Sequence, residues 1–253
     1  MKSSYKINLI LLIILTSGFG FICLSGINHI FFVKINSFTA YANPIIWSNL
    51  TFMGDTLTAS AFMLLFIRKR PDLVWSGIIA TIVATLIVNI LKYYLDIPRP
   101  PAIFDNNTIN IIGPVLYKHS FPSGHAVTIF TLTGILMFYF RSLFLRISLI
   151  LLALLIGISR IAVGVHWPVD VLAGAGLGSL CSMIGVYCVT KLGWNKIRPV
   201  QIVTGFILIS STFYLLLFYD CKYEQAVYLQ YFFAASVLVI GIREYYLLLT
   251  TRR

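Results

Sequence analysis

Acidic residues are scarce in this 253-residue sequence, which contains eight Asp and Glu against 19 Lys and Arg. Charged residues of both signs make up 11% of the chain, whereas an average soluble domain carries roughly 25%. Hydrophobic residues account for 59%. Because water-soluble packing cannot bury so much apolar surface, the composition excludes an ordinary soluble domain and predicts an integral membrane protein.

The few carboxylates are scattered along the chain, and they show no clustering typical of a metal site. A two-metal catalytic site needs several carboxylates close together. The four cysteines have no CxxC or metal-ligand spacing and are interpreted as small buried hydrophobic residues. We therefore expect no metal ion and no other cofactor.

The net charge of +11 would suggest nucleic-acid binding in a soluble protein. In a membrane protein the same excess is expected, because cytoplasmic loops collect Lys and Arg. The sequence therefore favours membrane lipids as its surroundings, and no nucleic-acid partner is expected. No sequence feature specifies an oligomeric state.

Apolar runs recur along the whole chain, and they are too long and too uniform for the alternating strands of a membrane barrel. They predict an all-α fold, a polytopic transmembrane helical bundle that forms a single integral membrane domain over 1–253. The first run is long for a signal peptide and lacks an A-x-A cleavage site, so we expect a retained helix. Eight spans are predicted, at 7–27, 49–67, 73–94, 124–140, 144–163, 168–190, 200–218 and 226–247.

The basic residues predict the orientation of these spans, since Lys and Arg concentrate in cytoplasmic loops. With a cytoplasmic N-terminus, two thirds of the basic residues in the loops and termini fall inside the cell. Those expected inside are Lys2, Lys6, Arg68, Lys69, Arg70, Arg141, Arg146, Lys191, Lys196, Arg198, Arg252 and Arg253. Those expected outside are Lys34, Lys92, Arg99, Lys118, Arg160 and Lys222.

Three polar segments stand at the outside edges of the spans, namely 92–100, 120–125 and 159–170. A charge within a span costs roughly 2.5–3.5 kcal/mol on insertion scales, so such residues usually serve a function. For each cation alone, snorkelling to the interface would be an equally good explanation. Because the predicted topology places all three segments at the same membrane face, we expect them to converge.

Convergence would gather three cations, Lys92, Arg99 and Arg160, around one small volume. Isolated cations repel one another, so this cluster predicts a multivalent anion, and a phosphoryl group is the obvious one. Ser123 and Gly124 follow a proline at the start of a predicted helix. The serine hydroxyl and the free backbone N–H groups there would face the same anion at the positive helix end.

Two histidines complete the predicted site. Asp170 follows His166 by four residues, which places both on one helical face if the span begins at the step from Trp167 to Pro168. A carboxylate on one imidazole nitrogen fixes the tautomer and makes the other nitrogen a better nucleophile. His166 is thus the predicted nucleophile, able to form a phosphohistidine. His125, beside the Ser123 turn, is placed to protonate the departing oxygen as a general acid.

At these residues the sequence resembles the type 2 phosphatidic acid phosphatase (PAP2) superfamily, whose signature is K-x6-RP, PSGH and SR-x5-H-x3-D. All three parts are present, in order and with the expected spacing. The resemblance covers roughly residues 50–190. The matching residues are Lys92, Arg99 and Pro100, then Pro122, Ser123, Gly124 and His125, and finally Ser159, Arg160, His166 and Asp170.

The resemblance implies a fold and a set of roles. It implies a six-helix core, so that 49–190 forms the catalytic core and 200–247 holds about two additional transmembrane helices. It also implies that His166 is the nucleophile, that Asp170 orients it and that His125 protonates the leaving group. The phosphoryl oxygens would be held by Lys92, Arg99, Ser123, Gly124 and Arg160.

The resulting hypothesis is a metal-independent membrane lipid phosphatase in a bacterial inner membrane, with its site at the extracytoplasmic face. The substrate class is a lipid phosphomonoester or diphosphate: a lipid A phosphate, phosphatidylglycerophosphate, undecaprenyl diphosphate or phosphatidate. The alternatives are a lipid-to-lipid phosphotransferase with the same site, a non-enzymatic lipid transporter or flippase, and an inactive relative. Phosphate release with and without an acceptor lipid separates the first alternative from hydrolysis.

Overall fold

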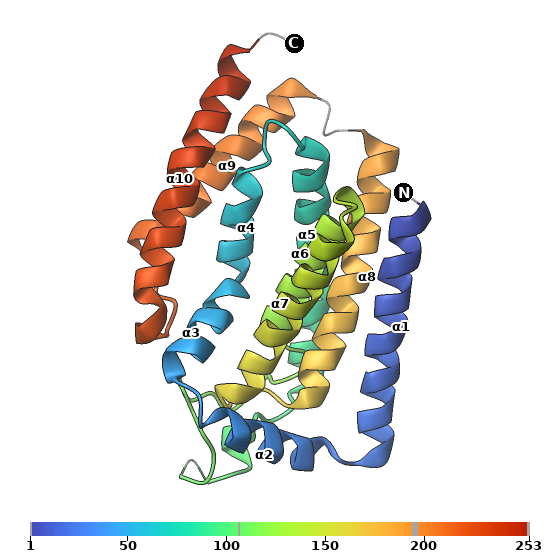
Figure 1. Ribbon diagram of the computed structural model, residues 1–253, viewed down its shortest axis with the longest axis vertical. Coiled ribbons are helices and arrows are strands. Elements are labelled where there is room, and N and C mark those ends of the chain that lie inside the picture. Colours follow the sequence, from blue (N-terminus) through green and yellow to red (C-terminus); the bar gives the residue numbers. More distant parts are fainter. Residues whose placement is uncertain (1, 106, 194–196, 252–253) are drawn as a thin grey trace.

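The computed structural model describes residues 2–105, 107–193 and 197–251, in which the elements of regular secondary structure are all helices (Figure 1). The predicted all-α bundle is therefore confirmed. The α-helices are α1 (Lys2–Ser25), α2 (Asn28–Thr39), α3 (Pro44–Met53), α4 (Thr56–Leu64), α5 (Pro71–Leu95), α6 (Gly124–Tyr139), α7 (Leu143–Ala162), α8 (Pro168–Leu192), α9 (Arg198–Leu217) and α10 (Val227–Thr250). Two 3-10 helices are η1 (Pro100–Ala102) and η3 (Glu224–Ala226).

Six helices in the described chain are long and apolar enough to cross a membrane, namely α1, α5, α7, α8, α9 and α10. They correspond to six of the eight predicted spans. The span predicted at 124–140 appears as α6, which is apolar but has 16 residues. A helix of that length rises about 24 Å, slightly less than the hydrocarbon core of a bilayer.

The prediction of one continuous span at 49–67 is wrong, because two short helices, α3 and α4, replace it. The break falls at Gly54 and Asp55. Asp55 has extended backbone angles (φ −70°, ψ 144°), and its side chain accepts a hydrogen bond from the backbone N–H of Leu57. An aspartate in this capping role begins a new helix. Because the residues on both sides are apolar, hydropathy alone does not reveal this break.

Helix α2 was not predicted, since its sequence has no sustained apolar run. It lies across one end of the bundle, roughly perpendicular to α1 (Figure 1). The buried Asn36 fastens it there: its amide nitrogen donates to the carbonyl oxygens of Asn110, Ile161 and Ala162 at 2.9–3.2 Å. One side chain thus ties α2 to the long connection before α6 and to the end of α7.

Helix α8 is the packing centre, because α1, α5 and α6 all contact it extensively. Its glycines allow α6 to approach closely, as the small-xxx-small spacing of Gly174 and Gly178 indicates. A Cβ atom on Gly174 would lie 2.6 Å from the carbonyl oxygen of Ser123. The position of the N-terminus of α6 therefore depends on the absence of a side chain at residue 174.

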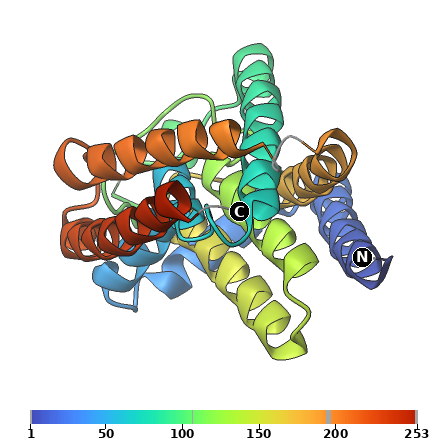
Figure 2. The same cartoon turned by 90° about the horizontal axis from the view of Figure 1, so that it is seen from above.

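The C-terminal helices α9 and α10 pack against each other, and both also pack against α4. Viewed from above, this pair lies on the opposite side of the bundle from α1 (Figure 2). Its connection, which includes η3, also contacts α3. The two additional helices are thus attached through the broken α3–α4 segment, away from the packing centre at α8.

The two ends of the bundle differ in the chain segments that they carry (Figure 1). The first turn of α1, the last turn of α10, the end of α8, the start of α9, and the α4–α5 and α6–α7 connections lie at one end. The α2 helix and the connections around 96–123, 163–167 and 218–226 lie at the other. Of the basic residues predicted to be cytoplasmic, Lys196, Arg252 and Arg253 lie outside the described residues.

Replacing Gly174 with Ala should destabilise the protein by about 1–3 kcal/mol, because the new methyl group meets backbone that cannot move freely. Gly176→Ala in the same helix is the control, since its Cβ would make an ordinary contact of 3.5 Å with Thr16. Thermal unfolding in detergent measures both variants. Equal midpoints for the two would show that the close approach does not constrain α6.

Candidate active site

The helices α5, α6, α7 and α8 each have one end at the same end of the bundle, and these helix ends, together with the connections beside them, hold all eight predicted site residues. Lys92 lies in the last turn of α5, and Arg99 directly precedes η1. The start of α6 carries Ser123, Gly124 and His125, and the last turn of α7 carries Arg160. His166 lies in the connection to α8, and Asp170 in the first turn of α8. The structure therefore brings together the three sequence segments that we expected to converge.

His166 is buried, with 2% of its surface exposed, and its Nδ1 lies 3.3 Å from Oδ2 of Asp170. Its Nε2 lies 3.4 Å from Nη1 of Arg99. A guanidinium can only donate hydrogen bonds, so Nε2 must be the acceptor and the proton must reside on Nδ1. We infer a neutral imidazole whose Nε2 lone pair points into the cation cluster.

The pairing of His166 with Asp170 arises differently from the prediction of a shared helical face. Helix α8 does begin at Pro168, as expected, so His166 lies before the helix. Asp170 turns back toward the helix start, where its Oδ2 accepts from the backbone N–H of Trp167 at 2.9 Å. This capping bond places the carboxylate beside the imidazole.

Asp170 has a further partner that the sequence motifs did not reveal. The hydroxyl of Ser120 donates to Asp170 Oδ2 at 2.5 Å, and both side chains are fully buried. Ser120 stands two residues before the PSGH motif, where a serine in a loop gives no signal of a partner 50 residues away. With the two bonds to Oδ2, the carboxylate is held in one orientation toward His166.

Lys92 and Arg99 are held by backbone carbonyl oxygens of two connections, the one between η1 and α6 and the one between α7 and α8. Lys92 Nζ donates to the carbonyl of His119 at 2.6 Å. Arg99 donates through Nε to Lys118 and through Nη1 to Val165, at 2.8 and 3.0 Å. These neutral acceptors orient the two cations without cancelling their charge.

Arg160 is 4% exposed, and its guanidinium has a different partner. Its Nη1 donates to the hydroxyl of Tyr223 at 3.0 Å, whereas its buried Nε has no partner among the described residues. Tyr223 lies in the connection between α9 and α10, outside every motif of the sequence.

The start of α6 presents unpaired polar groups to the same region. Ser123 is fully buried and its hydroxyl has no partner among the described residues. A Cβ built on Gly124 would meet no atom within 4 Å, so the space beside it is open. His125 follows and lies beside the α3–α4 break, where a Cβ on Gly54 would come within 3.4 Å of the His125 Cβ. A helix start with a free hydroxyl and open space is suited to an anion.

The charges around His166 determine its protonation. Burial, followed by the positive charges of Arg99, Arg160 and Lys92, holds the pKa of His166 well below its ordinary value, and His125 adds to the effect. The imidazole is therefore neutral at pH 7. Since the unfolded chain takes up this proton near pH 6.5 and the folded chain does not, acidification below that pH destabilises the fold.

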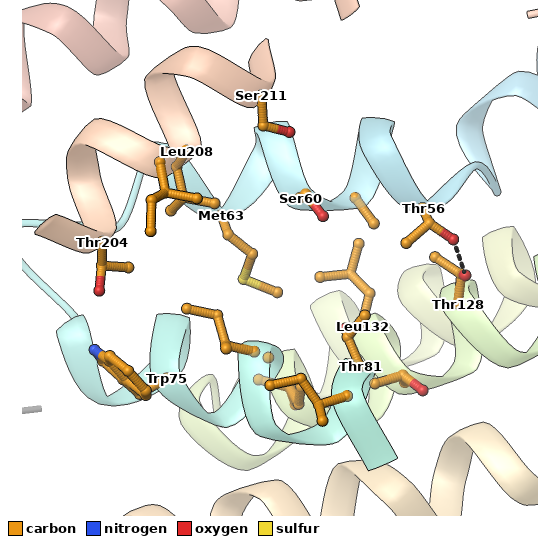
Figure 3. Close-up of a pocket in the computed structure, with 17 residues that line it drawn as sticks. Thr56, Ser60, Met63, Trp75, Thr81, Thr128, Leu132, Thr204, Leu208 and Ser211 are labelled. Carbon is orange, nitrogen blue, oxygen red and sulfur yellow. Dashed lines mark hydrogen bonds between the residues drawn. The ribbon is translucent and has the colours of Figure 1, made fainter. Parts of the chain in front are cut away.

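Two adjoining cavities extend from this site along the helices. One of about 190 Å³ is lined by Gly124 and by residues of α4, α5 and α6. The other, of about 320 Å³, adds residues of α9, and its wall is mostly apolar (Figure 3). Four threonines line both, and two of them hydrogen-bond across the cavities at 3.0 Å. The shared threonines are Thr56, Thr81, Thr128 and Thr131.

The donor set of the site suits an anion better than a metal ion. The described residues contain no group of three or more His, Cys, Asp or Glu that could hold a metal. The charged side chains around His166 are three cations and the single carboxylate of Asp170. Positive charge of this density repels a divalent cation and attracts a phosphoryl group.

The chain belongs to the PAP2 superfamily, whose sequence profile matches residues 73–194. An undecaprenyl-diphosphatase of Sulfolobus acidocaldarius is 33% identical over 130 residues, which cover 51% of this chain and 61% of that protein. A bacitracin transport permease protein BcrC of Bacillus licheniformis is 31% identical, covering 60% of this chain and 74% of that protein. The chain thus spans about three fifths of the first relative and about three quarters of the second.

A solved structure supports the same relationship. The crystal structure of Aquifex aeolicus LpxE superposes with a TM-score of 0.58 at 29% sequence identity. The match covers 95% of that protein and 64% of this chain. Together with the long apolar helices, these relatives establish a multi-pass membrane protein with the fold that the sequence predicted.

Replacing Lys92 with Met should raise the pKa of His166, because it removes one of the positive charges that oppose protonation. The pKa is measured by NMR of the ring nitrogens in ¹⁵N-histidine-labelled protein. Lys34→Met is the control, since Lys34 is exposed on α2 and does not affect His166. An unchanged pKa in the Lys92 variant would place that cation too far away to act on the nucleophile.

Proposed function

We propose that this protein is a membrane lipid phosphatase that hydrolyses a phosphomonoester or diphosphate on a lipid head group through a phosphohistidine on His166. The observation that carries the proposal is the environment of one side chain. His166 is neutral, bonded through Nδ1 to Asp170, and directs Nε2 toward Arg99. A nucleophile held in this way, among cations, suits the attack on a phosphate ester.

In the proposed first step, Nε2 of His166 attacks phosphorus, and the bond from phosphorus to the lipid oxygen breaks. His125 donates a proton to the departing oxygen, so the lipid leaves as a neutral alcohol or as a monophosphate. Arg99 and Arg160, with Lys92, stabilise the charge on the equatorial oxygens. Asp170 stabilises the positive charge that develops on the imidazole.

In the second step, water attacks the phosphohistidine and the bond between phosphorus and Nε2 breaks. His125, now unprotonated, takes the proton from the water. The products are inorganic phosphate and a neutral His166, and His125 is again protonated for the next turnover. The negative charge of a bound phosphoryl group is what favours this proton on His125 against the surrounding cations. The cycle is balanced without a metal ion, because the basic side chains and the helix start supply the charge stabilisation.

The two adjoining cavities support a lipid as the substrate. The smaller one is lined by Gly124 at the proposed phosphate site, and the larger, mostly apolar one continues between α4, α5, α6 and α9. A head group at His166 would therefore continue into an apolar space where the first part of a lipid chain can lie. The relatives favour lipids of the cell envelope, and undecaprenyl diphosphate, lipid A, phosphatidylglycerophosphate and phosphatidate form the panel to be tested.

The distribution of basic residues supports an extracytoplasmic site. Loop residues at the end of the bundle opposite the site include Arg68, Lys69, Arg70 and Arg141. At the other end, the cations Lys92, Arg99 and Arg160 are accounted for by the site itself. This distribution, by the positive-inside rule, supports the proposal that His166 lies at the periplasmic or outer face. The membrane proposed is a bacterial inner membrane.

His166→Ala should abolish phosphate release from the preferred lipid, and Asp170→Asn should lower kcat by roughly 10³–10⁴-fold, because the imidazole loses its orienting carboxylate. Release of inorganic phosphate in detergent micelles measures both. Mass spectrometry of acid-quenched wild-type protein should reveal a phosphorylated peptide that contains His166. Near wild-type turnover in His166→Ala would exclude the mechanism.

The rate should not change when EDTA is added to the wild-type enzyme, because no step uses a metal ion. The same assay with an added acceptor lipid separates hydrolysis from phosphotransfer, since a transferase would release little phosphate without an acceptor. For the His166 and Asp170 replacements, Lys118→Ala is the matched control, because this exposed lysine lies near the site and its side chain has no part in the proposed steps. A strong loss of rate with EDTA would contradict the metal-free cycle.

A further inference from the structure

The connection between α9 and α10 places one of its side chains in the proposed phosphate site. The Tyr223 hydroxyl accepts a hydrogen bond from Arg160 Nη1 at 3.0 Å, and both residues are at most 5% exposed. The guanidinium carbon lies 5.9 Å from the centre of the tyrosine ring, within the range of a cation–π contact. Tyr223 lies 29 residues beyond 73–194, the region that matches the PAP2 profile.

The contact leaves a defined part of Arg160 free. Nη1 is engaged by Tyr223, whereas the buried Nε has no partner among the described residues. Nε and Nη2 form the side edge of a guanidinium, and two parallel N–H groups on that edge match two oxygens of a phosphoryl group. Tyr223 thus holds Arg160 through Nη1, the nitrogen that is not part of this edge.

The chemistry of the partner matters as much as its position. A carboxylate at residue 223 would neutralise the guanidinium and compete with the phosphoryl oxygens for its hydrogen bonds. The phenol hydroxyl is uncharged, so it orients Arg160 and leaves the positive charge available to the substrate. Arg99 follows the same pattern, since it is held by neutral carbonyl oxygens.

Tyr223 is itself held firmly in place. Its ring packs on Gly113, where a Cβ atom would lie 2.6 Å from the ring carbon Cε1. Four residues earlier, the Tyr219 hydroxyl donates to Asp55 Oδ2 at 2.5 Å, which fastens the connection to the α3–α4 break. Gln230 donates to the carbonyls of Leu215 and Tyr219 and joins the ends of α9 and α10.

We propose that Tyr223 is a positioning residue for Arg160, and that the α9–α10 pair is required for full activity because it supplies this tyrosine. The inference rests on the proposed phosphatase function. Tyr223 would act on the transition state, because the orientation of the Nε and Nη2 edge of Arg160 matters most when charge accumulates on the equatorial oxygens of the phosphoryl group. Losing the hydroxyl should therefore lower kcat more than it raises KM.

Tyr223→Phe keeps the ring against Gly113 and removes the hydroxyl. We expect kcat to fall about 10-fold with little change in KM, as for the loss of a hydrogen bond to a charged group. Tyr228→Phe is the control, because it removes a hydroxyl from a tyrosine that is 86% exposed at the start of α10 and takes no part in holding Tyr223 or Arg160. Its kcat should stay near the wild-type value once unfolding midpoints confirm that both variants are folded.

A double-mutant cycle tests whether Tyr223 acts through Arg160. In an Arg160→Lys background the guanidinium is absent, so adding Tyr223→Phe should lower kcat far less than it does in the wild type. An equal fold-loss in both backgrounds would show that Tyr223 acts elsewhere, and wild-type kcat in Tyr223→Phe would overturn the inference outright.

If Tyr223→Phe does not fold, Gly113→Ala is the second variant, since its methyl group displaces the ring and should lower kcat without Tyr223 being altered.

Inhibition by orthovanadate separates this inference from the phosphatase proposal. Vanadate adopts five-coordinate geometry like that of phosphoryl transfer, and its binding does not require turnover. Weaker vanadate binding in Tyr223→Phe, by about the 10-fold factor expected for kcat, would support the positioning role even if none of the four lipids were hydrolysed. Lipid hydrolysis with identical vanadate inhibition in wild type and Tyr223→Phe would refute the positioning role and leave the phosphatase proposal standing.

Discussion

Positive charge concentrated around one imidazole is the constraint on which the site depends. Lys92, Arg99 and Arg160 all act on His166, and Asp170 is the carboxylate that the described chain places among them. Charges so close in a partly apolar setting repel strongly, and removing them from water has a further cost. The fold sustains the cluster because neutral acceptors orient each cation, and a phosphoryl group at the open start of α6 would offset the excess charge.

The helices are arranged so that this end of the bundle stays fixed. Gly174 lets α6 approach α8 closely, which sets the position of the free hydroxyl of Ser123. Asn36 ties α2 to the carbonyl oxygens at the end of α7, the same turn that carries Arg160. Helix ends hold most of the site groups accurately, because each end is fixed by packing along the whole helix. The connections that carry Arg99 and His166 are joined by the hydrogen bond from Arg99 to the Val165 carbonyl.

Much of this arrangement could be predicted from the sequence, because a membrane helix requires a long apolar run and the three motifs interrupt such runs with charge. Hydropathy could not reveal the break at Asp55, where one capping carboxylate divides a run that is apolar on both sides. It also missed α2, whose attachment depends on Asn36. Ser120 and Tyr223 were missed for a different reason: their partners lie 50 and 63 residues away, and contacts at such separations exist only in the folded chain.

The central claim is that the cation cluster is a phosphoryl pocket, and phosphate binding to the folded protein tests it most directly. Thermal unfolding in detergent should be measured in rising inorganic phosphate against chloride at equal ionic strength, for wild type and Arg99→Met. A ligand that binds only the folded state adds about 2.7 kcal/mol at 100 times its Kd. The account predicts that phosphate raises the midpoint of the wild type and does so much less in the variant. Equal midpoints in phosphate and chloride for the wild type would contradict it.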